Sequence, residues 1–265
     1  MFDPCEPQHR DESADREPKT TLEARHSQVL LRYHAPMCGR FTLTVSARVL
    51  ADLFGVEDLP DLRPRYNIAP TQQVLVVRGA ADTTPAFGEA RWGLIPGWAK
   101  DAKIGARMIN ARAETVADKP AFRSATRRRR CLIPSDGFYE WRKLAGGKQP
   151  YLIHFADGSP FAFAGLWERW HDPDGKTVDS CTIITTTPND LVAELHDRMP
   201  VILPHRHHNE WLGSDTLARE RLDELLRPHP SPGMEAYPVS TRVNSPRTDD
   251  PECVRRIDQP SLGLE

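Results

Sequence analysis

Cys38 lies in the stretch Met37-Cys-Gly-Arg-Phe41, which has the form of a translation start followed by a nucleophile. If translation began at Met37 and that residue were removed, Cys38 would carry a thiol and a free α-amine. The ordinary pKa of an α-amine is about 7.7–8.0, so much of it is a neutral nucleophile near physiological pH. Such an amine can form a Schiff base with an aldehyde, and the thiol can then add and close a thiazolidine. The alternative is a buried cysteine that opens a strand.

Two further segments place polar side chains where chemistry is feasible. Asn110 and Arg112 are two residues apart, so they share a face if the segment is extended. Glu140 stands between Tyr139 and Trp141, where partial removal from water would raise the pKa of its carboxyl and suit it to proton transfer. Taken singly, Asn110 also fits a turn and Glu140 a half-exposed strand position.

His196 and a polar, aromatic loop over residues 65–71 complete the set of unusual segments. His196 stands at the end of a short helical pattern, with Arg198 two residues later and Pro200 ending the turn. A helix C-cap is the alternative interpretation of His196.

The elements that must position these residues are mostly strands. The strand candidates are residues 39–43, 74–77, 89–93, 131–134, 138–141, 151–155, 161–167 and 181–185. Helical spacing is found in residues 45–54, 189–196 and 216–226. Residues 146–147 and 172–176 are typical of hairpin loops. Short strands without regular strand–helix alternation predict an α+β fold, with an antiparallel β-barrel-like core and flanking short helices.

Residues 1–36 differ in composition from the remainder. They are rich in Asp, Glu, Arg, Pro and Ser, which is typical of a segment that cannot bury a core. Their seven acidic and five basic residues account for the whole formal charge of −2, so residues 37–265 carry no net charge and any nucleic-acid surface must be a local basic patch. We expect a disordered extension over 1–36, one domain over 37–250 and a C-terminal tail over 251–265.

The composition excludes several classes of protein. No apolar stretch is long enough for a membrane span or a signal peptide, so we expect a cytoplasmic protein without a membrane partner. The five cysteines lack a C-x-x-C pair, which argues against a disulfide framework or a zinc site. His205–His208 lacks carboxylate or cysteine partners and is interpreted as a solvated helix start. We expect a monomer with no cofactor and no metal.

Taken together, the chemical segments resemble one family. The matching stretches are Met37–Phe41, Arg65–Pro70, Arg91–Pro96 with Trp98, Asn110–Glu114, Cys131–Trp141, Ala164–Trp167, Thr185–Asn189, His196–Pro200 and Val243–Pro246. In this order they cover nearly all of residues 37–250. They resemble the SOS-response-associated peptidase (SRAP) family, whose members shield abasic sites in single-stranded DNA.

The resemblance implies roles for named residues. Cys38 would be the nucleophile and Asn110 would orient the adduct. Glu140 would move protons during Schiff-base and ring formation, and His196 would assist with the opened deoxyribose and with reversal. DNA contacts are implied at Arg40, Asn67, Trp92, Trp98, Arg112, Thr185 and Arg198. The partner would be single-stranded DNA with abasic sites, and the bound protein would be associated with the nucleoid.

The residue types agree with these roles. Arg40, Arg112 and Arg198 each lie within two residues of a candidate catalytic residue, so phosphates would be attracted to the reacting aldehyde. Trp92 and Trp98 could stack on flanking bases, with core packing an equal alternative for each. The run 127–130 is interpreted as the solvated end of a helix, with a DNA-backbone role as the alternative.

The N-terminal segment before Cys38 departs from the family's pattern. With residues 1–36 attached, Cys38 has an amide nitrogen, and neither a Schiff base nor a thiazolidine can form. We favour a true start at Met37. The alternatives are removal by processing, including autocatalytic cleavage before Cys38, and loss of the family's chemistry.

Two other functions stay open. One is a thiol peptidase or autoprotease in which Cys38 acts with His196 and Glu140. The other is a non-catalytic module that binds single-stranded DNA through Trp and Arg side chains.

Overall fold

The computed structural model describes residues 1, 39–58, 61–80, 83–172 and 174–258. The chain divides into two units between residues 34 and 35, and apart from Met1 every described residue belongs to the second. The strands are β1 (Phe41–Leu43), β2 (Arg65–Ile68), β3 (Gln73–Ala80), β4 (Thr83–Trp92), β5 (Asn110–Arg112), β6 (Arg130–Ser135), β7 (Gly137–Leu144), β8 (Gly147–Phe155), β9 (Phe161–His171), β10 (Thr177–Thr186), β11 (Met199–Pro200), β12 (Ile202–Leu203) and β13 (Met234–Pro238).

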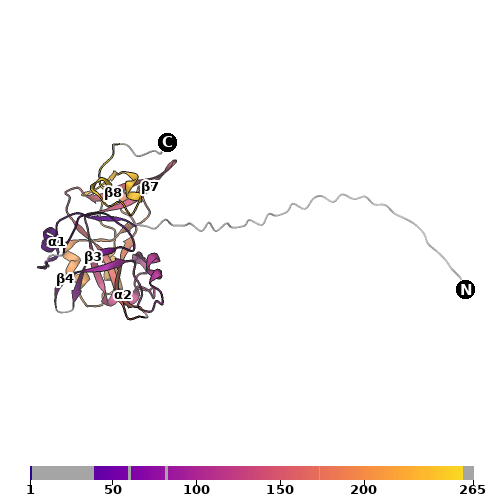
Figure 1. Ribbon diagram of the computed structural model, residues 1–265. Helices are drawn as coiled ribbons and strands as arrows, with labels where there is room; N and C mark the ends of the chain where they lie inside the picture. Colours follow the sequence, from indigo (N-terminus) through magenta and orange to yellow (C-terminus); the bar gives the residue numbers. More distant parts are fainter. Residues whose placement is uncertain (2–38, 59–60, 81–82, 173, 259–265) are drawn as a thin grey trace. The chain divides into compact units, whose positions relative to one another are not determined.

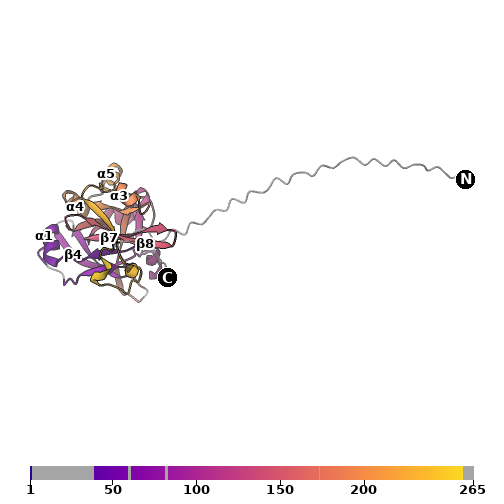
Figure 2. The same ribbon diagram turned by 90° about the horizontal axis from the view of Figure 1, so that it is seen from above.

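Short helices flank these strands. The α-helices are α1 (Ala47–Phe54), α2 (Arg123–Arg128), α3 (Asp190–Ala193), α4 (His208–Leu212) and α5 (Arg219–Leu225). The 3-10 helices are η1 (Ala102–Arg107), η2 (Ala113–Thr115), η3 (His205–His207), η4 (Thr241–Asn244) and η5 (Pro251–Cys253). Helices α3, α4 and α5 gather on one side of the unit (Figure 2). Among the described residues, no helix is long and apolar enough to cross a membrane.

Five strands close into a barrel in the order β10, β4, β3, β6 and β9, with β9 pairing back onto β10. Both faces of the barrel strands carry side chains without exposed surface: Val76 and Phe163 share one face with Ile133, and Leu132 lies on the other. In Figure 1 the barrel strands β3 and β4 lie below β7 and β8, which belong to a second sheet. The α+β fold with a barrel-like core and short flanking helices is therefore confirmed.

The barrel departs from the expected antiparallel pattern at β10. β4 runs parallel to β10 at Arg91 and Trp92, and β5 runs parallel to its next stretch, Ile183 to Thr185. A closed ring of five strands cannot alternate direction at every step, so one pair must be parallel. After β4 the chain leaves the sheet for residues 93–109 and returns in the same direction. β5 therefore pairs with β10 directly after the stretch that β4 pairs with.

The second sheet is antiparallel and has the order β13, β8, β7, β1 and β2. β1 lies between β2 and β7, and its Phe41 ring packs edge-on against Trp92 (5.2 Å between ring centroids) and Phe163 (5.7 Å). These contacts join the second sheet to the barrel.

The Asp136 carboxylate fixes the end of β1. It accepts hydrogen bonds from Thr42 Oγ1 (2.5 Å), Thr44 N (2.5 Å), Thr44 Oγ1 (2.7 Å) and Val45 N (3.0 Å). Hydrogen bonds to a carboxylate are stronger than those between neutral groups, so this short strand is held firmly against β7.

Local signals predict the helix at 45–54 well, and other segments less well. In α1, Ser46 Oγ accepts from Val49 N, and Gly55 ends the helix at a φ of 64°. The helix expected over 189–196 is only α3, capped by Asn189, and the expected loop 65–71 contains β2. Residues 251–258, expected in a tail, pack on the second sheet, where Cys253 is buried and Arg256 pairs with Val239.

His208 corrects the interpretation of 205–208 as solvated. Its ring is 5% exposed and stacks on Phe54 with 5.4 Å between ring centroids. Because a carbonyl only accepts, His208 Nε2 donates to Leu203 O (3.1 Å). The buried Nδ1 has no hydrogen-bond partner among the described residues. Burial lowers the pKa of His208 to about 4, so the ring is neutral at physiological pH.

We expect His208 to make stability fall as the pH falls from 6.5 to 4. The unfolded chain takes up a proton on this ring near its ordinary pKa of 6.5, whereas the folded chain does so only near 4. Unfolding therefore takes up a proton in this window, and the free energy of unfolding decreases by up to about 3 kcal/mol. Urea unfolding at several pH values, followed by tryptophan fluorescence, measures this loss.

His208→Gln keeps a donor for Leu203 O but does not titrate, so it should lose this part of the pH dependence. His171→Gln is the control, because His171 is exposed and should leave the pH dependence unchanged. A His208→Gln protein with the wild-type pH dependence would contradict the assignment.

Candidate active site

Cys38 lies outside the described residues, but the chain that follows it is well defined. Gly39 is buried, and Arg40 O accepts a hydrogen bond from Tyr139 N (3.0 Å). The β1–β7 register pairs Phe41 with Phe138, so the next residues toward the N-terminus run along Tyr139 and Glu140. The described chain thus begins beside Glu140.

Glu140 is a buried carboxylate. It lies on β7 opposite Tyr151 and is 2% exposed. Its place between Tyr139 and Trp141 predicts only partial removal from water, and the second sheet buries this side chain more completely.

Asn110 and Arg112 share a face of β5, as their spacing predicts. Between them Ala111 is buried, whereas Asn110 is half-buried and Arg112 is exposed. The parallel register with β10 pairs Asn110 with Ile183 and Arg112 with Thr185. The Arg112 guanidinium makes no hydrogen bond or ion pair with another described residue, so its charge is available to an anion.

Arg198 lies in the same region but its charge is already compensated. It donates to both carboxylate oxygens of Glu114 (2.6 and 2.9 Å) and to Thr185 O (2.6 Å), and its side chain is largely buried. These hydrogen bonds hold the pKa of the Glu114 carboxyl below its ordinary value. Arg198 therefore offers less attraction to phosphate than the sequence suggests.

His196 lies between α3 and β11. Arg198 N donates to His196 Nδ1 (3.1 Å), and Asp197 Oδ1 lies 3.0 Å from the same nitrogen. The backbone N–H of Arg198 can only donate and the Asp197 carboxylate can only accept, so the two contacts need opposite protonation states of Nδ1. The Asp197 side chain is exposed, and its contact becomes an ion pair only when the ring is doubly protonated.

The fold brings these residues together as two groups. β5, β10 and β11 join Asn110, Arg112, Thr185, His196 and Arg198, while β1 and β7 join Arg40 and Glu140. Trp92 is buried and contacts both groups. Its ring packs on Phe41, and its Nε1 donates to Ile109 O (2.8 Å), next to Asn110.

Three residues expected to contact DNA are buried instead. Trp92, Asn67 and Thr185 are each 0% exposed. Trp92 therefore follows the core-packing alternative, and Thr185 Oγ1 lies 3.5 Å from Ala111 O. These side chains shape the site but offer no surface to a base or phosphate. Trp98 is 61% exposed and keeps a face available for stacking.

Asn67 and Arg40 form a structural clamp on the segment 243–248. Asn67 Nδ2 lies within hydrogen-bond distance of the carbonyls of Val243 (3.1 Å), Ser245 (2.9 Å) and Thr248 (2.6 Å). The Arg40 guanidinium donates to Asn67 Oδ1 (2.9 Å) and Val243 O (2.6 Å), and burial lowers its pKa. Arg40 thus has a packing role in addition to its positive charge.

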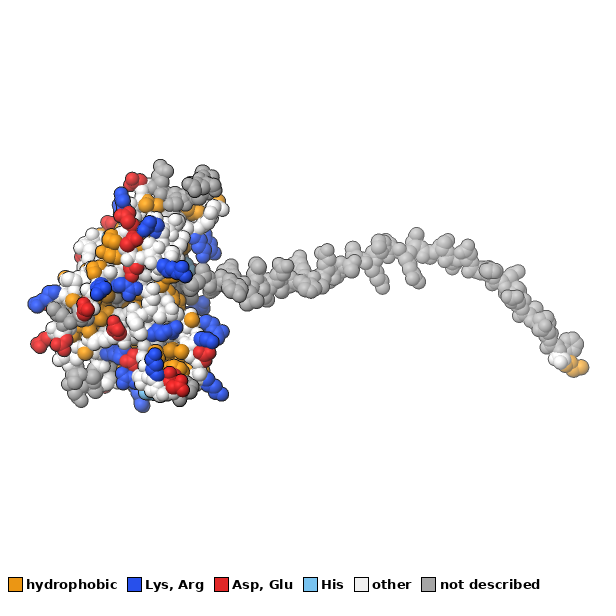
Figure 3. Space-filling view, viewed as in Figure 1, with side chains coloured by type: hydrophobic (Ala, Val, Ile, Leu, Met, Phe, Trp, Pro, Cys, Tyr) orange, Lys and Arg blue, Asp and Glu red, His pale blue; other side chains and the backbone are white. Residues whose placement is uncertain are grey.

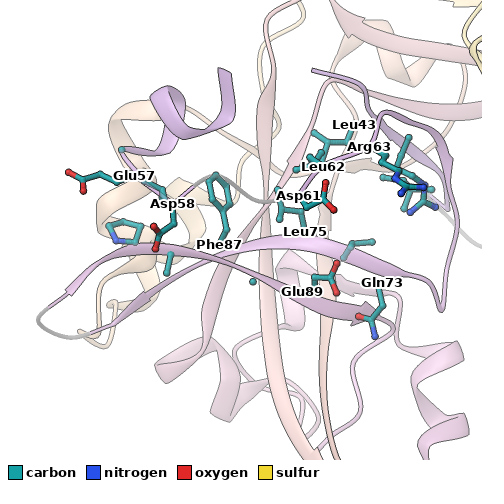
Figure 4. A pocket seen from close by; sticks show the side chains of 18 of the residues that line it. Leu43, Glu57, Asp58, Asp61, Leu62, Arg63, Gln73, Leu75, Phe87 and Glu89 are labelled. Atoms are coloured by element: carbon teal, nitrogen blue, oxygen red, sulfur yellow. The ribbon is translucent and has the colours of Figure 1, made fainter. Parts of the chain in front are cut away.

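A hollow of about 1040 Å³ lies between the end of α1 and the β3–β4 hairpin (Figure 4). Its apolar wall includes Leu75 and Phe87, and its lining carries the carboxylates Glu57, Asp58 and Glu89. None of the described residues expected at the catalytic or DNA-binding site lines it. The lining also carries Asp61, Arg63 and Arg65, so its carboxylates outnumber its guanidiniums by four to two, and we do not assign DNA to this hollow.

Sequence reasoning gave no role to Glu114 or Asp136, although both stand within matched stretches. Glu114 compensates Arg198, 84 residues away, and Asp136 holds β1. An acidic residue two positions after Arg112 is a weak signal of a counter-charge, and only the fold identifies its partner.

The chain is similar to several known proteins. A family model described as SOS response associated peptidase (SRAP) matches residues 37–246. The "Abasic site processing protein YoqW" of Bacillus subtilis (strain 168) is 46% identical over 222 residues, which cover 82% of this chain and 99% of that protein. The "Abasic site processing protein HMCES" of Gallus gallus is 31% identical over 265 residues, covering 84% of this chain and 78% of that protein.

A solved structure agrees with the sequence matches. A crystal structure of a Bacteroides thetaiotaomicron protein has a TM-score of 0.75 and 28% identity, and the match covers 83% of this chain and 100% of that chain. The family model and the relatives together show that the chain belongs to the SRAP family.

Proposed function

We propose that this protein recognises abasic sites in single-stranded DNA and captures them covalently through Cys38. Relatives that are named abasic site processing proteins and match most of this chain support the choice of substrate. An abasic deoxyribose equilibrates with a ring-opened aldehyde, which is the electrophile that an N-terminal cysteine can capture. A single strand leaves that aldehyde open to approach.

The observation that carries this proposal is the position of β1 beside Glu140. Tyr139 N holds Arg40 O, and Gly39 lies one residue closer to Cys38. The register thus places Gly39, the residue that directly follows Cys38 in the sequence, beside a buried carboxylate, which is the kind of group that transfers protons in a water-poor site.

The proposed reaction has two bond-forming steps. The Cys38 α-amine adds to the aldehyde carbon, and loss of one water from the carbinolamine gives the Schiff base. The Cys38 sulfur then adds to the imine carbon, and its proton ends on the ring nitrogen of the thiazolidine. The net change is the loss of one water.

Each neighbouring side chain has a task in this reaction. Glu140 delivers the proton that lets the carbinolamine hydroxyl leave as water, and it accepts the proton of the attacking groups. Asn110 orients the opened sugar from β5. His196 assists with the sugar hydroxyl and with reversal. Arg112 attracts the adjacent phosphate.

A chain that begins at Met37 should cross-link to a single-stranded oligonucleotide with one abasic site, because loss of Met37 exposes the Cys38 amine. The full chain should not cross-link while residues 1–36 remain attached, since an acylated nitrogen cannot form an imine. Intact mass spectrometry measures both the adduct and the state of the N-terminus.

Equal cross-linking by the two proteins, with the extension intact, would contradict an N-terminal amine mechanism. Loss of the extension from the full chain during incubation, blocked by Cys38→Ala, would instead support the autoprotease alternative.

Glu140→Gln should slow adduct formation by about 10²–10⁴-fold, because the amide keeps the size of the side chain but cannot carry a proton. Glu89→Gln is the matched control, since Glu89 is an exposed carboxylate on β4. Quenched time courses on abasic oligonucleotides give the rates. A Glu140→Gln protein that reacts at the wild-type rate would assign the proton transfers to another group.

Arg112→Ala should weaken binding to single strands of any sequence and reduce the slope of log affinity against log salt by about 0.7. Its guanidinium is exposed and interacts with Glu114 only at longer range, whereas that of Arg198 is hydrogen-bonded to both Glu114 carboxylate oxygens. Arg198→Ala should therefore change the slope less. Fluorescence anisotropy across a salt series measures both, with Lys176→Ala as an exposed control. An unchanged slope for Arg112→Ala would place the DNA elsewhere.

A further inference from the structure

Positive charge is concentrated in one part of a chain that has a net charge of −2. Residues 100–130 contain ten basic and three acidic residues. Two of the acids are paired with arginines from outside the segment, Glu114 with Arg198 and Asp118 with Arg219. The third, Asp101, accepts from Lys103 N at the start of η1. The basic side chains of this segment are therefore not balanced from within it.

Three of these cations form a stripe, defined here as Lys119, Arg123 and Arg127. Arg123 N donates to Lys119 O (2.9 Å), and Arg127 follows one turn later in α2, so the three side chains recur at helical i, i+4 spacing. All three are exposed, while Ala125 and Thr126 on the other face are buried. The stripe faces solvent.

The stripe has no counter-charge. The side chains of Lys119, Arg123 and Arg127 make no hydrogen bond or ion pair with another described residue. The neighbouring acid Glu168 is taken by Arg129 (2.7 Å). Like charges at i, i+4 destabilise a helix, so Arg123 and Arg127 oppose the folding of α2. In Figure 3, Lys and Arg side chains are interspersed with Asp and Glu side chains over the lower part of the molecule, around the position of α2 in Figure 1.

The stripe is continuous with the proposed site. β5 ends at Arg112, η2 follows directly, and Thr115 O at its end accepts from Lys119 N (3.0 Å). Thr126 Oγ1 also donates to Val116 O (3.3 Å), which ties α2 to this connection. The cations of the stripe therefore lie on the segment that follows Arg112 along the chain.

We propose that this stripe binds the phosphate backbone of the nucleic acid that flanks the abasic site. The proposal rests on the function proposed above and extends it from the reacting sugar to the neighbouring strand. A regular row of uncompensated cations fits a regular row of phosphates, and such contacts position a strand without reading its sequence.

The test uses the variant Lys119→Ala/Arg123→Ala/Arg127→Ala, whose changed side chains are exposed. Loss of three phosphate contacts should lower the salt slope by about 2 if the flank is single-stranded and by about 2.7 if it is duplex. On a single-stranded flank, the affinity lost between about 50 and 200 mM salt should shrink by about 20-fold. The cross-link yield at saturating protein should equal that of the wild type.

Four oligonucleotides locate the contact: one trimmed close to the abasic site, one with a single-stranded 5′ flank, one with a single-stranded 3′ flank, and one with a duplex flank. The variant should match the wild type on the trimmed oligonucleotide and bind more weakly when the correct flank is present. Lys143→Ala/Lys148→Ala/Lys176→Ala removes the same charge from exposed positions near the β7–β8 turn and just before β10, and should retain wild-type affinity.

Equal affinity and slope for the α2 variant and the wild type on all four oligonucleotides would overturn the proposal. Equal losses in the control variant would also overturn it, because they would reflect total charge. A wild-type protein that neither binds nor cross-links would instead overturn the function on which the proposal rests. Equal melting temperatures of the three proteins exclude unfolding as the cause.

Discussion

The central position of β1 is the constraint on which the site depends. This strand has three residues, yet it pairs with β2 on one side and β7 on the other, and Asp136 holds its end through four hydrogen bonds. A strand held in this way cannot shift along its neighbours without breaking both ladders. The point at which the chain enters β1 is therefore fixed relative to Glu140.

β10 provides the second fixed reference. It closes the barrel with β9 and β4, and further along it pairs with β5 and β11. Because β5 and β11 are only three and two residues long, they depend on β10 for their position. Residues 93–109 can thus leave the sheet, carrying the exposed Trp98, without displacing Asn110 or Arg112. Trp92, which pairs with Cys181 of β10, also packs on Phe41 of β1 and so links the two strands.

The fold class and the segments that meet at the site are predictable from the sequence, because caps, alternation and motif spacing are local. Exposure is not. Trp92, Asn67 and Thr185 are residue types that suit either a DNA surface or a buried hydrogen-bond network, and only the second sheet and the barrel decide between them. The pairing of Arg198 with Glu114 joins residues 84 apart and leaves no local signal. The same limit applies to His208, whose neighbours Phe54 and Leu203 are supplied by the fold.

Hydrogen bonds and ion pairs within the fold decide which arginines can attract phosphate. In the sequence Arg40, Arg112 and Arg198 look equivalent, but in the structure Arg40 supports the clamp on 243–248 and Arg198 is neutralised by Glu114. The attraction for phosphate thus shifts to Arg112 and to the uncompensated cations that follow it along α2. A protein whose domain carries no net charge can still attract a polyanion, because at physiological ionic strength charges are screened over roughly 8 Å and the local excess decides the binding. In the proposed complex, Glu114 limits the positive potential next to the abasic sugar, and the stripe on α2 supplies it farther along the strand.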